Sequence, residues 1–422
     1  MTPSPPGFVQ RGRSSTASGV PVAPRHWLNR TVLGAGLASF LSDFSHEAIT
    51  ALLPAFLAAL GAPAYALGII EGVSDGAASF MKLLAGHYAD RTGHGKEVAF
   101  AGYVVTGLFP AFLAVAGSWP VVLLARAIGW MGRGVRGPPR DAILTASVSR
   151  ADLGKAFGFH RAGDTLGALT GPALALGLVT TLGLREIFWL AVVPGLLAAL
   201  AFGLLVRADR PRDREEISLV ASLTGLPSRF RAYLSAVLVF GLADFSHTLL
   251  IAYAAVALTP ALGPVQAAAA GAGLYLIRNA TYAVASYPLG ALGDRFGRTR
   301  LLAGGYALAV LTLLGFALAP PSLPAFALLF SLAGIYIAAE DTLEGAVAGA
   351  LAPERRRGIA FGALATVNGV GDLVSSIAIG FVFALAGYPT GFVLAAIMAA
   401  FGTALLVFGT GPGAGTRGTR AP

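Results

Sequence analysis

Two short segments carry side chains that can transfer protons or bind metal ions. Residues 43–46 read Asp-Phe-Ser-His, and the same four residues return at 244–247, 201 positions later and again inside a long apolar run. A buried carboxylate can exchange a proton near neutral pH. Imidazole can relay protons, or bind Zn, Ni or Fe together with carboxylates. The two segments therefore predict either a proton relay or a divalent-metal cage, in both cases made of Asp43, His46, Asp244 and His247.

Many other charged side chains lie within apolar runs. Each would cost about 2.5–3.5 kcal/mol facing lipid at mid-membrane, against a typical net stability of about 5–15 kcal/mol. Most must therefore face one another or water, which predicts a polar cavity. Besides Asp43 and Asp244, these residues are Glu47, Glu71, Asp75, Lys82, Arg126, Arg133, Arg136, Arg140, Asp141, Arg161, Asp164, Arg278, Glu340, Asp341, Glu344 and Asp372.

Helical spacing places several of these side chains on common faces. Positions i, i+3, i+4 and i+7 of a helix share one side. Four polar faces follow from this rule: Asp43 with His46, Glu47 and Thr50; Glu71 with Asp75 and Lys82; Arg126 with Arg133, Arg136 and Arg140; and Asp244 with His247 and Thr248.

The composition places the chain in a membrane. Of its 422 residues, 55% are hydrophobic and only 12% charged, and the mean hydropathy is +0.72, which nearly excludes a soluble globular protein. The net charge of +9 resides largely between apolar runs, where it orients the chain in the bilayer and does not indicate nucleic-acid binding. The absence of cysteine excludes disulfides, thiolate ligands and a cysteine nucleophile.

The chain consists of two copies of one half. Residues 86–93 are echoed by 290–297, and Phe157-Gly158 is echoed by Phe361-Gly362, at a distance of 204 positions (90 to 294, 157 to 361). A fold repeated in parallel is a common transporter plan. We expect an all-α integral membrane protein in which two six-helix bundles surround a central cavity.

About twelve runs are long enough to span a bilayer, at about 20 residues each. Basic connections alternate with nearly uncharged ones, which predicts that both termini and the middle loop are cytoplasmic. Residues 1–30 lack an apolar core and are predicted to be a disordered tail, not a cleaved signal peptide. The expected organisation is a tail at 1–30, one bundle at 31–206, a linker at 207–230, a second bundle at 231–409 and a tail at 410–422.

The positions of the second half that are equivalent to two of these arginines hold glutamates, which predicts charge pairing between the halves. Glu340 then falls at the position of Arg136, and Glu344 at that of Arg140. An unpaired buried charge costs far more than a paired one. The adjacent Pro138-Pro139 predicts a broken helix at this place. We interpret the surrounding arginines as a cytoplasmic gate, with an anion-recognition surface as the alternative; the gating and inter-bundle charges are Arg133, Arg136, Arg140, Glu340, Asp341 and Glu344.

Two loops carry the pattern G-x-x-x-D-R-x-G-x-x-[KR]. Its residues are Gly86, Asp90, Arg91, Gly93 and Lys96, and again Gly290, Asp294, Arg295, Gly297 and Arg300. With this doubled pattern the chain resembles the major facilitator superfamily over essentially its whole length after the first thirty residues. The resemblance implies alternating access, a cavity lined by the first and seventh helices, and a latch role for these loops.

Two further motifs resemble parts of that family. Arg126-Ala127-Ile128-Gly129 is similar to a motif of its fourth helix, whose arginine is associated with proton coupling. Gly158, Gly167, Gly171 and Pro172 resemble the fifth-helix pattern of its antiporters, although Ala175 and Leu176 replace a final Gly-Gly. This resemblance implies export of substrate against proton entry.

We therefore predict a monomeric, proton-coupled exporter of a small solute in a bacterial inner membrane, with no cofactor and no enzymatic activity. The alternative is a divalent-metal permease of the same fold that uses the paired Asp/His segments. Static ion pairs of Asp43 or Asp244 with Arg126 or Arg278 are equally open. The expected partners are a small-molecule or ion substrate, protons and lipid, without nucleic acid. The predicted coupling and cavity residues are Asp43, His46, Glu47, Glu71, Asp75, Arg126, Asp244, His247, Arg278 and Asp372.

Overall fold

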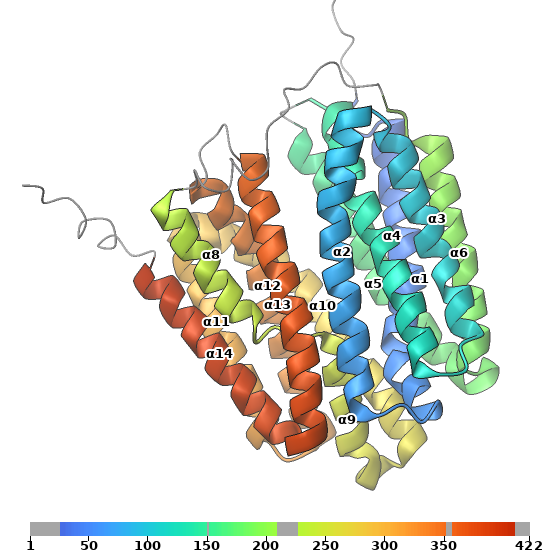
Figure 1. Ribbon diagram of the computed structural model, residues 1–422, viewed down its shortest axis with the longest axis vertical. Coiled ribbons are helices and arrows are strands. Elements are labelled where there is room, and N and C mark those ends of the chain that lie inside the picture. The colour runs from blue at the N-terminus through green and yellow to red at the C-terminus, as the bar shows by residue number, and fades with distance from the viewer. Residues whose placement is uncertain (1–25, 150–151, 209–226, 352–356, 410–422) are drawn as a thin grey trace, which may run out of the picture.

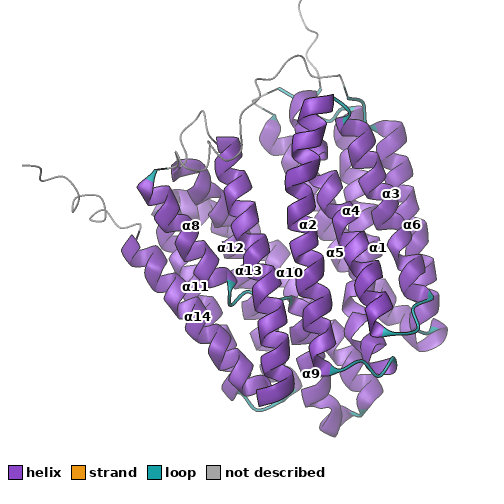
Figure 2. Cartoon of the chain, in the orientation of Figure 1, coloured by secondary structure: helices purple, strands orange, loops and turns teal. Residues whose placement is uncertain are grey.

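The computed structural model describes residues 26–149, 152–208, 227–351 and 357–409. Within these ranges the chain forms helices and loops and contains no strand (Figure 2). The predicted tail at 410–422 lies outside the described residues, as do most of the predicted tail at 1–30 and most of the predicted linker at 207–230.

Two bundles of helices make up the described molecule (Figure 1). The first contains α1 (Arg30–Ala59), α2 (Ala64–Thr92), α3 (Gly95–Ala114), α4 (Trp119–Ser147), α5 (Leu153–Leu182) and α6 (Leu184–Leu205). The second contains α8 (Ser228–Gly241), α9 (His247–Leu262), α10 (Pro264–Phe296), α11 (Arg298–Leu318), α12 (Leu323–Leu351), α13 (Arg357–Ala386) and α14 (Tyr388–Gly409). Because α8 and α9 together occupy the seventh predicted span, the expected two six-helix bundles are confirmed.

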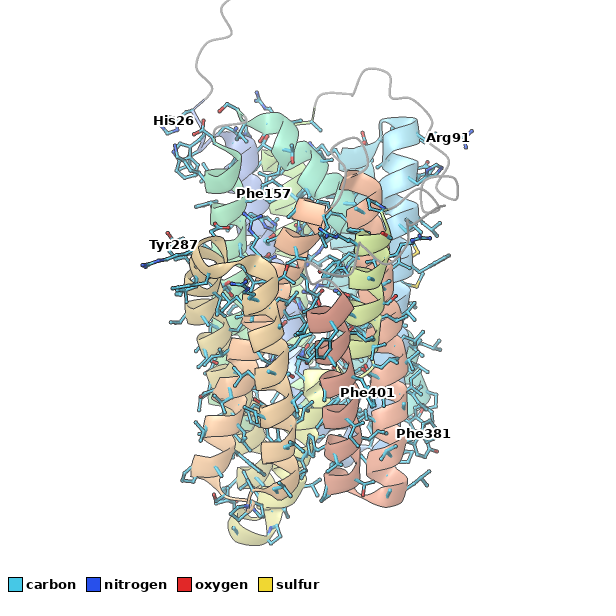
Figure 3. All side chains as sticks on the ribbon, turned by 90° about the vertical axis from the view of Figure 1, so that its left-hand side faces the viewer. His26, Arg91, Phe157, Tyr287, Phe381 and Phe401 are labelled. Carbon is cyan, nitrogen blue, oxygen red and sulfur yellow. The ribbon has the colours of Figure 1, made fainter. Side chains whose placement is uncertain are left out.

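The outer surface of these bundles is apolar, and charged residues lie in the interior. Seven described helices are long and apolar enough to cross a membrane by composition: α3, α5, α6, α11, α12, α13 and α14. Large apolar side chains such as Phe381 and Phe401 project from the outer surface (Figure 3). The interior charges lie on α1, α2, α4 and α10 and also on α5, α12 and α13, which are among these seven. The polar residues are therefore enclosed by an apolar outer surface, as a lipid environment requires.

The seventh span is broken at the second Asp-Phe-Ser-His segment (Figure 2). α8 ends at Gly241 and α9 begins at His247, whereas the first copy lies inside the continuous α1. Two serines of α13 bond the backbone freed by the break: the Ser246 N–H donates to Ser376 Oγ at 3.0 Å, and Ser375 Oγ donates to the Asp244 carbonyl at 2.9 Å. The predicted helical face through Asp244 is therefore wrong, because Asp244 precedes α9.

A break predicted at Pro138-Pro139 is also wrong. α4 continues from Trp119 to Ser147 through both prolines. Each proline removes a helical N–H, but tight packing against neighbouring helices tolerates such a loss within a membrane bundle. Gly134, one turn before Pro138, packs directly on the Ala78 backbone of α2. This contact holds α4 in place through the proline pair.

The glycines of α5 let it approach α1 closely. A Cβ at Gly167 would lie 2.5 Å from the Phe40 carbonyl oxygen, and one at Gly171 would overlap the Phe44 carbonyl. Small residues at such positions permit close helix packing in membranes. Gly158, in contrast, has no atom within 4 Å of the place that a Cβ would occupy. Gly167 and Gly171 thus permit close packing of α5 on α1. That the glycine pattern indicates an antiporter stays a prediction.

The two bundles meet along α2 and α13, which lie side by side in Figure 1. The rings of Tyr65 and Phe381 stack with centroids 5.1 Å apart and planes 8° apart. Further along, a Cβ at Gly380 would lie 2.9 Å from the Gly68 Cα. Near the middle of α2, Ser79 fills the space beside Gly369. Contact between the halves therefore extends from the start of α2 to about its midpoint.

The doubled loop pattern ends α2 and α10 in equivalent ways. Gly93 and Gly297 follow the two helices with φ of 70° and 99°, a region that favours glycine. A Cβ at Gly86 would lie 3.4 Å from Pro138 of α4, and one at Gly290 would lie 3.2 Å from Thr342 of α12. The helix before each loop thus packs on the fourth helix of its own half: α2 packs on α4, and α10 packs on α12. The latch role implied by the resemblance stays a prediction.

Candidate functional site

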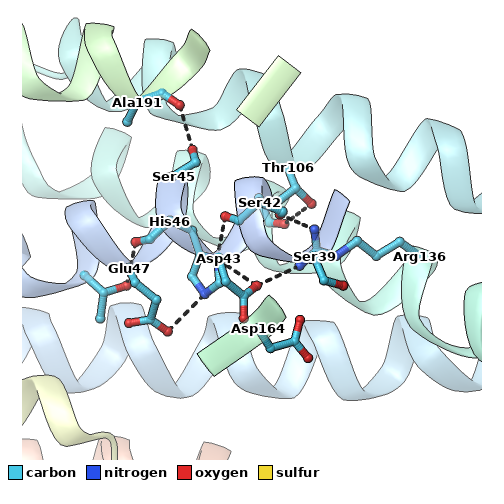
Figure 4. Close-up of polar contacts among 12 residues, drawn as sticks. Ser39, Ser42, Asp43, Ser45, His46, Glu47, Thr106, Arg136, Asp164 and Ala191 are labelled. Carbon is cyan, nitrogen blue, oxygen red and sulfur yellow. Dashed lines mark hydrogen bonds and ion pairs between the residues drawn. The ribbon is translucent and has the colours of Figure 1, made fainter. Parts of the chain in front are cut away.

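A buried histidine on α1 lies between two carboxylates (Figure 4). The His46 Nδ1 atom is 3.0 Å from the Ser42 carbonyl oxygen and 3.5 Å from Asp43 Oδ1. On the other side of the ring, Nε2 is 3.1 Å from Glu47 Oε1, a close ionic contact without hydrogen-bond angles. Both ring nitrogens therefore lie close to acceptor oxygens, Nδ1 beside Ser42 and Asp43 and Nε2 beside Glu47.

Arg136 of α4 pairs with the first carboxylate of this group (Figure 4). Its Nη2 is 3.3 Å from Asp43 Oδ1, Nη1 donates to Ser42 Oγ, and the guanidinium lies 4.5 Å from the Tyr103 ring centroid. Arg136 thus supplies a counter-charge to Asp43 from within the first half of the chain.

The expected pairing of Arg136 with Glu340, and of Arg140 with Glu344, is wrong in this conformation. Arg136 pairs with Asp43, and Arg140 pairs with its neighbour Asp141 at 3.0 Å. The repeat shift identifies equivalent positions in two related halves, and equivalence does not imply proximity. A nearer acid within the same half therefore takes each arginine.

Arg126 lies fully buried at the centre of the first half. It forms an ion pair with Glu71 of α2 at 3.1 Å and donates two hydrogen bonds of 3.1 Å to Thr50 of α1. Its guanidinium stacks 3.4 Å from the Trp130 ring centroid, and the Trp130 Nε1–H donates to Asp75 at 2.8 Å. Arg126 thus binds Glu71, not Asp43 as the static-pair alternative expected.

Tyr275 of α10 connects the two halves. Its hydroxyl donates to Glu47 Oε2 at 2.5 Å and lies 3.1 Å from His247 Nε2, and the His247 and Tyr275 rings stack 4.9 Å apart. Since the single hydroxyl hydrogen goes to Glu47, the bond to His247 requires a proton on its Nε2. The contacts His46–Glu47–Tyr275–His247 therefore join the histidines of both Asp-Phe-Ser-His copies.

Two more bonds cross between the halves. Ser246 Oγ, at the break before α9, donates to Glu71 Oε2 at 3.1 Å. Asn279 Nδ2 of α10 donates to the Ala168 carbonyl of α5 at 3.1 Å. Two acids of the first half, Glu47 and Glu71, thus each accept a hydrogen bond from the second half.

Tyr275 and Asn279 were not among the predicted site residues. A signal was nevertheless present, because the repeat distance of 204 places Tyr275 at the position of Glu71 and Asn279 at that of Asp75. Applying the shift to α2 as well as α4 would have revealed a polar face on α10. Arg278, which was predicted, donates to Asn279 Oδ1 at 3.0 Å.

The acids of the second half are arranged differently. Glu344 accepts hydrogen bonds from the Tyr306 hydroxyl and, at 2.8 Å, from Asn368. Asp341 accepts one from the Tyr282 hydroxyl at 2.9 Å. Glu340 Oε2 is buried without a partner. Glu344 and Asp341 are therefore held by neutral donors.

The four residues of the predicted metal cage are not assembled into one. In the part of the chain that the structure describes, no three His, Cys, Asp or Glu side chains are grouped to hold a metal ion. His46 faces Glu47, and His247 faces Tyr275. The geometry is that of a chain of contacts, ionic between His46 and Glu47 and hydrogen-bonded from Glu47 through Tyr275 to His247.

Comparisons with known proteins agree with this fold. The sequence matches the family description of the Major Facilitator Superfamily over residues 35–266 and 236–421. It is 29% identical over 383 residues to an uncharacterized MFS-type transporter of Methanocaldococcus jannaschii, covering 90% of this chain and 95% of that protein. It is 25% identical over 307 residues to the multidrug resistance protein MdtG of Escherichia coli, covering 69% of this chain and 72% of that protein.

Among solved structures, a bacterial homologue of the human lysosomal transporter Spinster superposes with a TM-score of 0.73. Its sequence identity is 16%, and the match covers 90% of this chain and 96% of that one, so the likeness concerns the fold. The doubled loop pattern, the two six-helix bundles and the family match over nearly the whole chain lead to one assignment. The chain belongs to the Major Facilitator Superfamily and is a membrane transporter.

Proposed function

We propose that this transporter couples proton entry to the export of a small solute by alternating access. The observation that carries the proposal is the buried chain of contacts from His46 through Glu47 and Tyr275 to His247. Its members can hold or pass a proton, and its central hydrogen bond crosses between the two halves. The fifth-helix glycine pattern and the similarity to a multidrug resistance protein support export.

The coupling follows from the chemistry of Glu47. As a carboxylate it accepts the Tyr275 hydrogen bond in a charge-assisted contact, which is about twice as strong as a neutral one. A proton arriving on Glu47 removes the charge and weakens the bond between the halves. Proton binding thereby favours a conformation in which the halves separate at this point, as rocking transport requires.

The test uses purified protein in liposomes with a pH gradient and the solute that a toxicity screen of a deletion strain identifies. Asp43→Asn and Glu47→Gln should abolish pH-driven transport and leave solute exchange without a gradient partly intact, because an amide keeps the shape but does not titrate. Glu97→Gln, which changes an exposed acid at the start of α3, is the matched control. Full pH-driven transport in Glu47→Gln would refute the proposed coupling.

The orientation in the membrane is also part of the proposal. His26 and Arg91 lie at the same end of the molecule (Figure 3), and the described basic residues Arg30, Lys155 and Arg207 flank helix ends that the alternating helix directions bring to that end. An excess of lysine and arginine indicates the cytoplasmic side. Reporters fused after residue 208 and after residue 409 should therefore be active in the cytoplasm of a bacterium. A periplasmic signal at either position would overturn this orientation.

A further inference from the structure

A further histidine is buried between α1 and α5, outside the chain of contacts that joins His46 to His247. Ser39 Oγ of α1 is 2.6 Å from His160 Nε2, and Asp164 Oδ2, one turn along α5, is 3.6 Å from Nδ1. Ser39 is fully buried, and His160 is 5% exposed. Each nitrogen of the His160 ring therefore has an oxygen nearby, one neutral and one acidic.

These neighbours fit the ring both with and without an added proton. A serine hydroxyl donates a hydrogen bond to an unprotonated Nε2 and accepts one from a protonated Nε2, so the Ser39 contact persists in either state. The Asp164 carboxylate supplies the counter-charge that a protonated imidazole requires. Ser39, His160 and Asp164 can thus hold a proton or release it while the three side chains stay in place.

Polar side chains connect this group with the surface. Arg140 Nη1 of α4 is 3.5 Å from Ser39 Oγ, and Arg140 pairs with Asp141, whose side chain is 45% exposed. The Asp164 side chain is itself 18% exposed. The charged groups that act on His160 most strongly are Asp164 and Arg161 of α5 and Arg136 and Arg140 of α4. Charged and hydroxyl groups thus extend from His160 to the surface.

This surface lies at the end of the molecule where α1 and α5 begin. Phe157, one turn before His160, appears toward the same end as His26 and Arg91 in Figure 3. The proposed orientation places this end in the cytoplasm. Glu47, eight residues after Ser39 on α1, lies about 12 Å farther from it along the helix.

The ion pair of Arg136 with Asp43 lies between His160 and Glu47. Ser39, Asp43 and Glu47 follow one another at intervals of four residues along one face of α1, with Asp43 in the middle (Figure 4). Arg136 binds this middle position through Asp43 and Ser42. An arginine keeps its proton in proteins, and a fixed positive charge opposes the passage of another proton, as in pores that exclude protons. Arg136 is therefore a barrier between two groups that can each hold a proton.

We propose that Ser39, His160 and Asp164 form a second proton-binding site, open to the end of the molecule at which α1 begins, and that the Arg136–Asp43 pair separates this site from Glu47. The inference rests on the proposed function, because it adds the step by which the proton carried by Glu47 leaves the protein. The proton passes from one site to the other when Arg136 moves away from Asp43. Proton flow is in this way tied to a change of conformation.

Proton binding by the purified full chain in lipid nanodiscs tests the site itself, without any solute. Titration against a pH-indicator dye counts the protons bound between about pH 5 and pH 8, the range in which histidine titrates. His160→Gln should bind one proton fewer than the parent protein, and Ser39→Ala should shift the pH at which this proton binds. His87→Gln, which removes an exposed histidine of α2, calibrates the loss of one proton, and Thr170→Ala on the exposed face of α5 should change nothing. The thermal unfolding of each variant establishes that it is folded.

Proton entry into liposomes that contain the dye pyranine tests the barrier, again without solute and driven by a K⁺ diffusion potential. Arg136→Gln should raise proton entry about tenfold, because it removes the fixed positive charge between the two sites. Arg136→Lys keeps the charge and should stay as tight as the parent protein. Adding His160→Gln to Arg136→Gln should return proton entry to the parent level.

An equal number of bound protons in folded His160→Gln and in the parent protein would overturn the inference. Unchanged proton entry in folded Arg136→Gln would also overturn it, and so would entry that persists in the double variant. If Arg136→Gln does not fold, the count of bound protons decides alone. Full pH-driven transport in Glu47→Gln would refute the proposed function, whereas the protons bound by His160→Gln are counted without transport, so the two failures are distinguishable.

Discussion

Removal of one hydroxyl group should shift the balance between the conformations of this transporter. Tyr275→Phe deletes the donor to Glu47 and retains the ring that stacks on His247. A hydrogen bond to a charged group contributes about 1.5–3 kcal/mol. If the bond is made only in the described conformation, its loss lowers the population of that conformation relative to the others by about 10- to 150-fold, because 1.4 kcal/mol corresponds to a factor of ten.

Distances between spin labels measure this shift directly. The chain contains no cysteine, so Tyr88→Cys on α2 and Phe361→Cys on α13 introduce two labelling sites without further changes. Both positions are exposed, at 56% and 44%. They lie on α2 and α13 beyond the stretch in which the halves touch. Tyr275→Phe should lower the population at the label-to-label distance found in the parent protein and raise the population at a second, distinct distance.

The matched control is Tyr253→Phe. The Tyr253 hydroxyl donates to the Phe316 carbonyl at 3.3 Å within the second half, so its loss leaves the contact between halves intact. An unchanged distance distribution in Tyr275→Phe would refute the argument that this bond holds the halves together. An equal change in Tyr253→Phe would refute it as well, because the effect would then not depend on the contact between halves.

Three other substitutions test packing and charge, each measured by chemical unfolding in detergent and followed by tryptophan fluorescence. Arg126→Gln should lower the free energy of unfolding by about 3–5 kcal/mol, because it leaves Glu71 buried without its counter-charge; a loss below about 1 kcal/mol would contradict this. Gly171→Ala should cost about 1–3 kcal/mol through overpacking against α1, whereas Gly177→Ala, which meets no atom within 4 Å, should be neutral. Ser376→Ala should cost about 1–3 kcal/mol by leaving a backbone N–H at the helix break unsatisfied, and wild-type stability would show that this N–H finds another partner.

The sequence predicted the fold well because the signals for it are local or repeated. Apolar runs of sufficient length locate the spans, and the doubled loop pattern around Asp90 and Asp294 locates the two halves. Spacing along α1 also placed Asp43, His46 and Glu47 on one face, as the structure has them. Periodicity within one helix depends only on helix geometry, so it is readable without knowledge of the neighbouring helices.

Which side chains form ion pairs between different helices was not predictable in the same way. Arg136 met Asp43 instead of Glu340 because helix rotation and packing, which no spacing reveals, decide which acid is nearest. The break in the seventh span was missed because Asp244 lies in a run with no proline or glycine cluster. The groups that bond the broken backbone lie on another helix: the repeat distance of 204 places Ser375 and Ser376 where the first half has Gly171 and Pro172. Those serines supply the bonds that permit the break.

A helix that begins inside the membrane brings a fixed electric charge with it. The first backbone N–H groups of a helix carry roughly half an elementary positive charge, which does not titrate. α9 begins at His247, directly after Ser246, whose hydroxyl donates to Glu71. Glu71 thus lies between the charge on Arg126, which belongs to its own half, and the charge at the start of α9, which belongs to the other half. In the proposed rocking motion Arg126 would travel with Glu71 and the helix terminus would not, so the motion itself would change the electric field at that carboxylate.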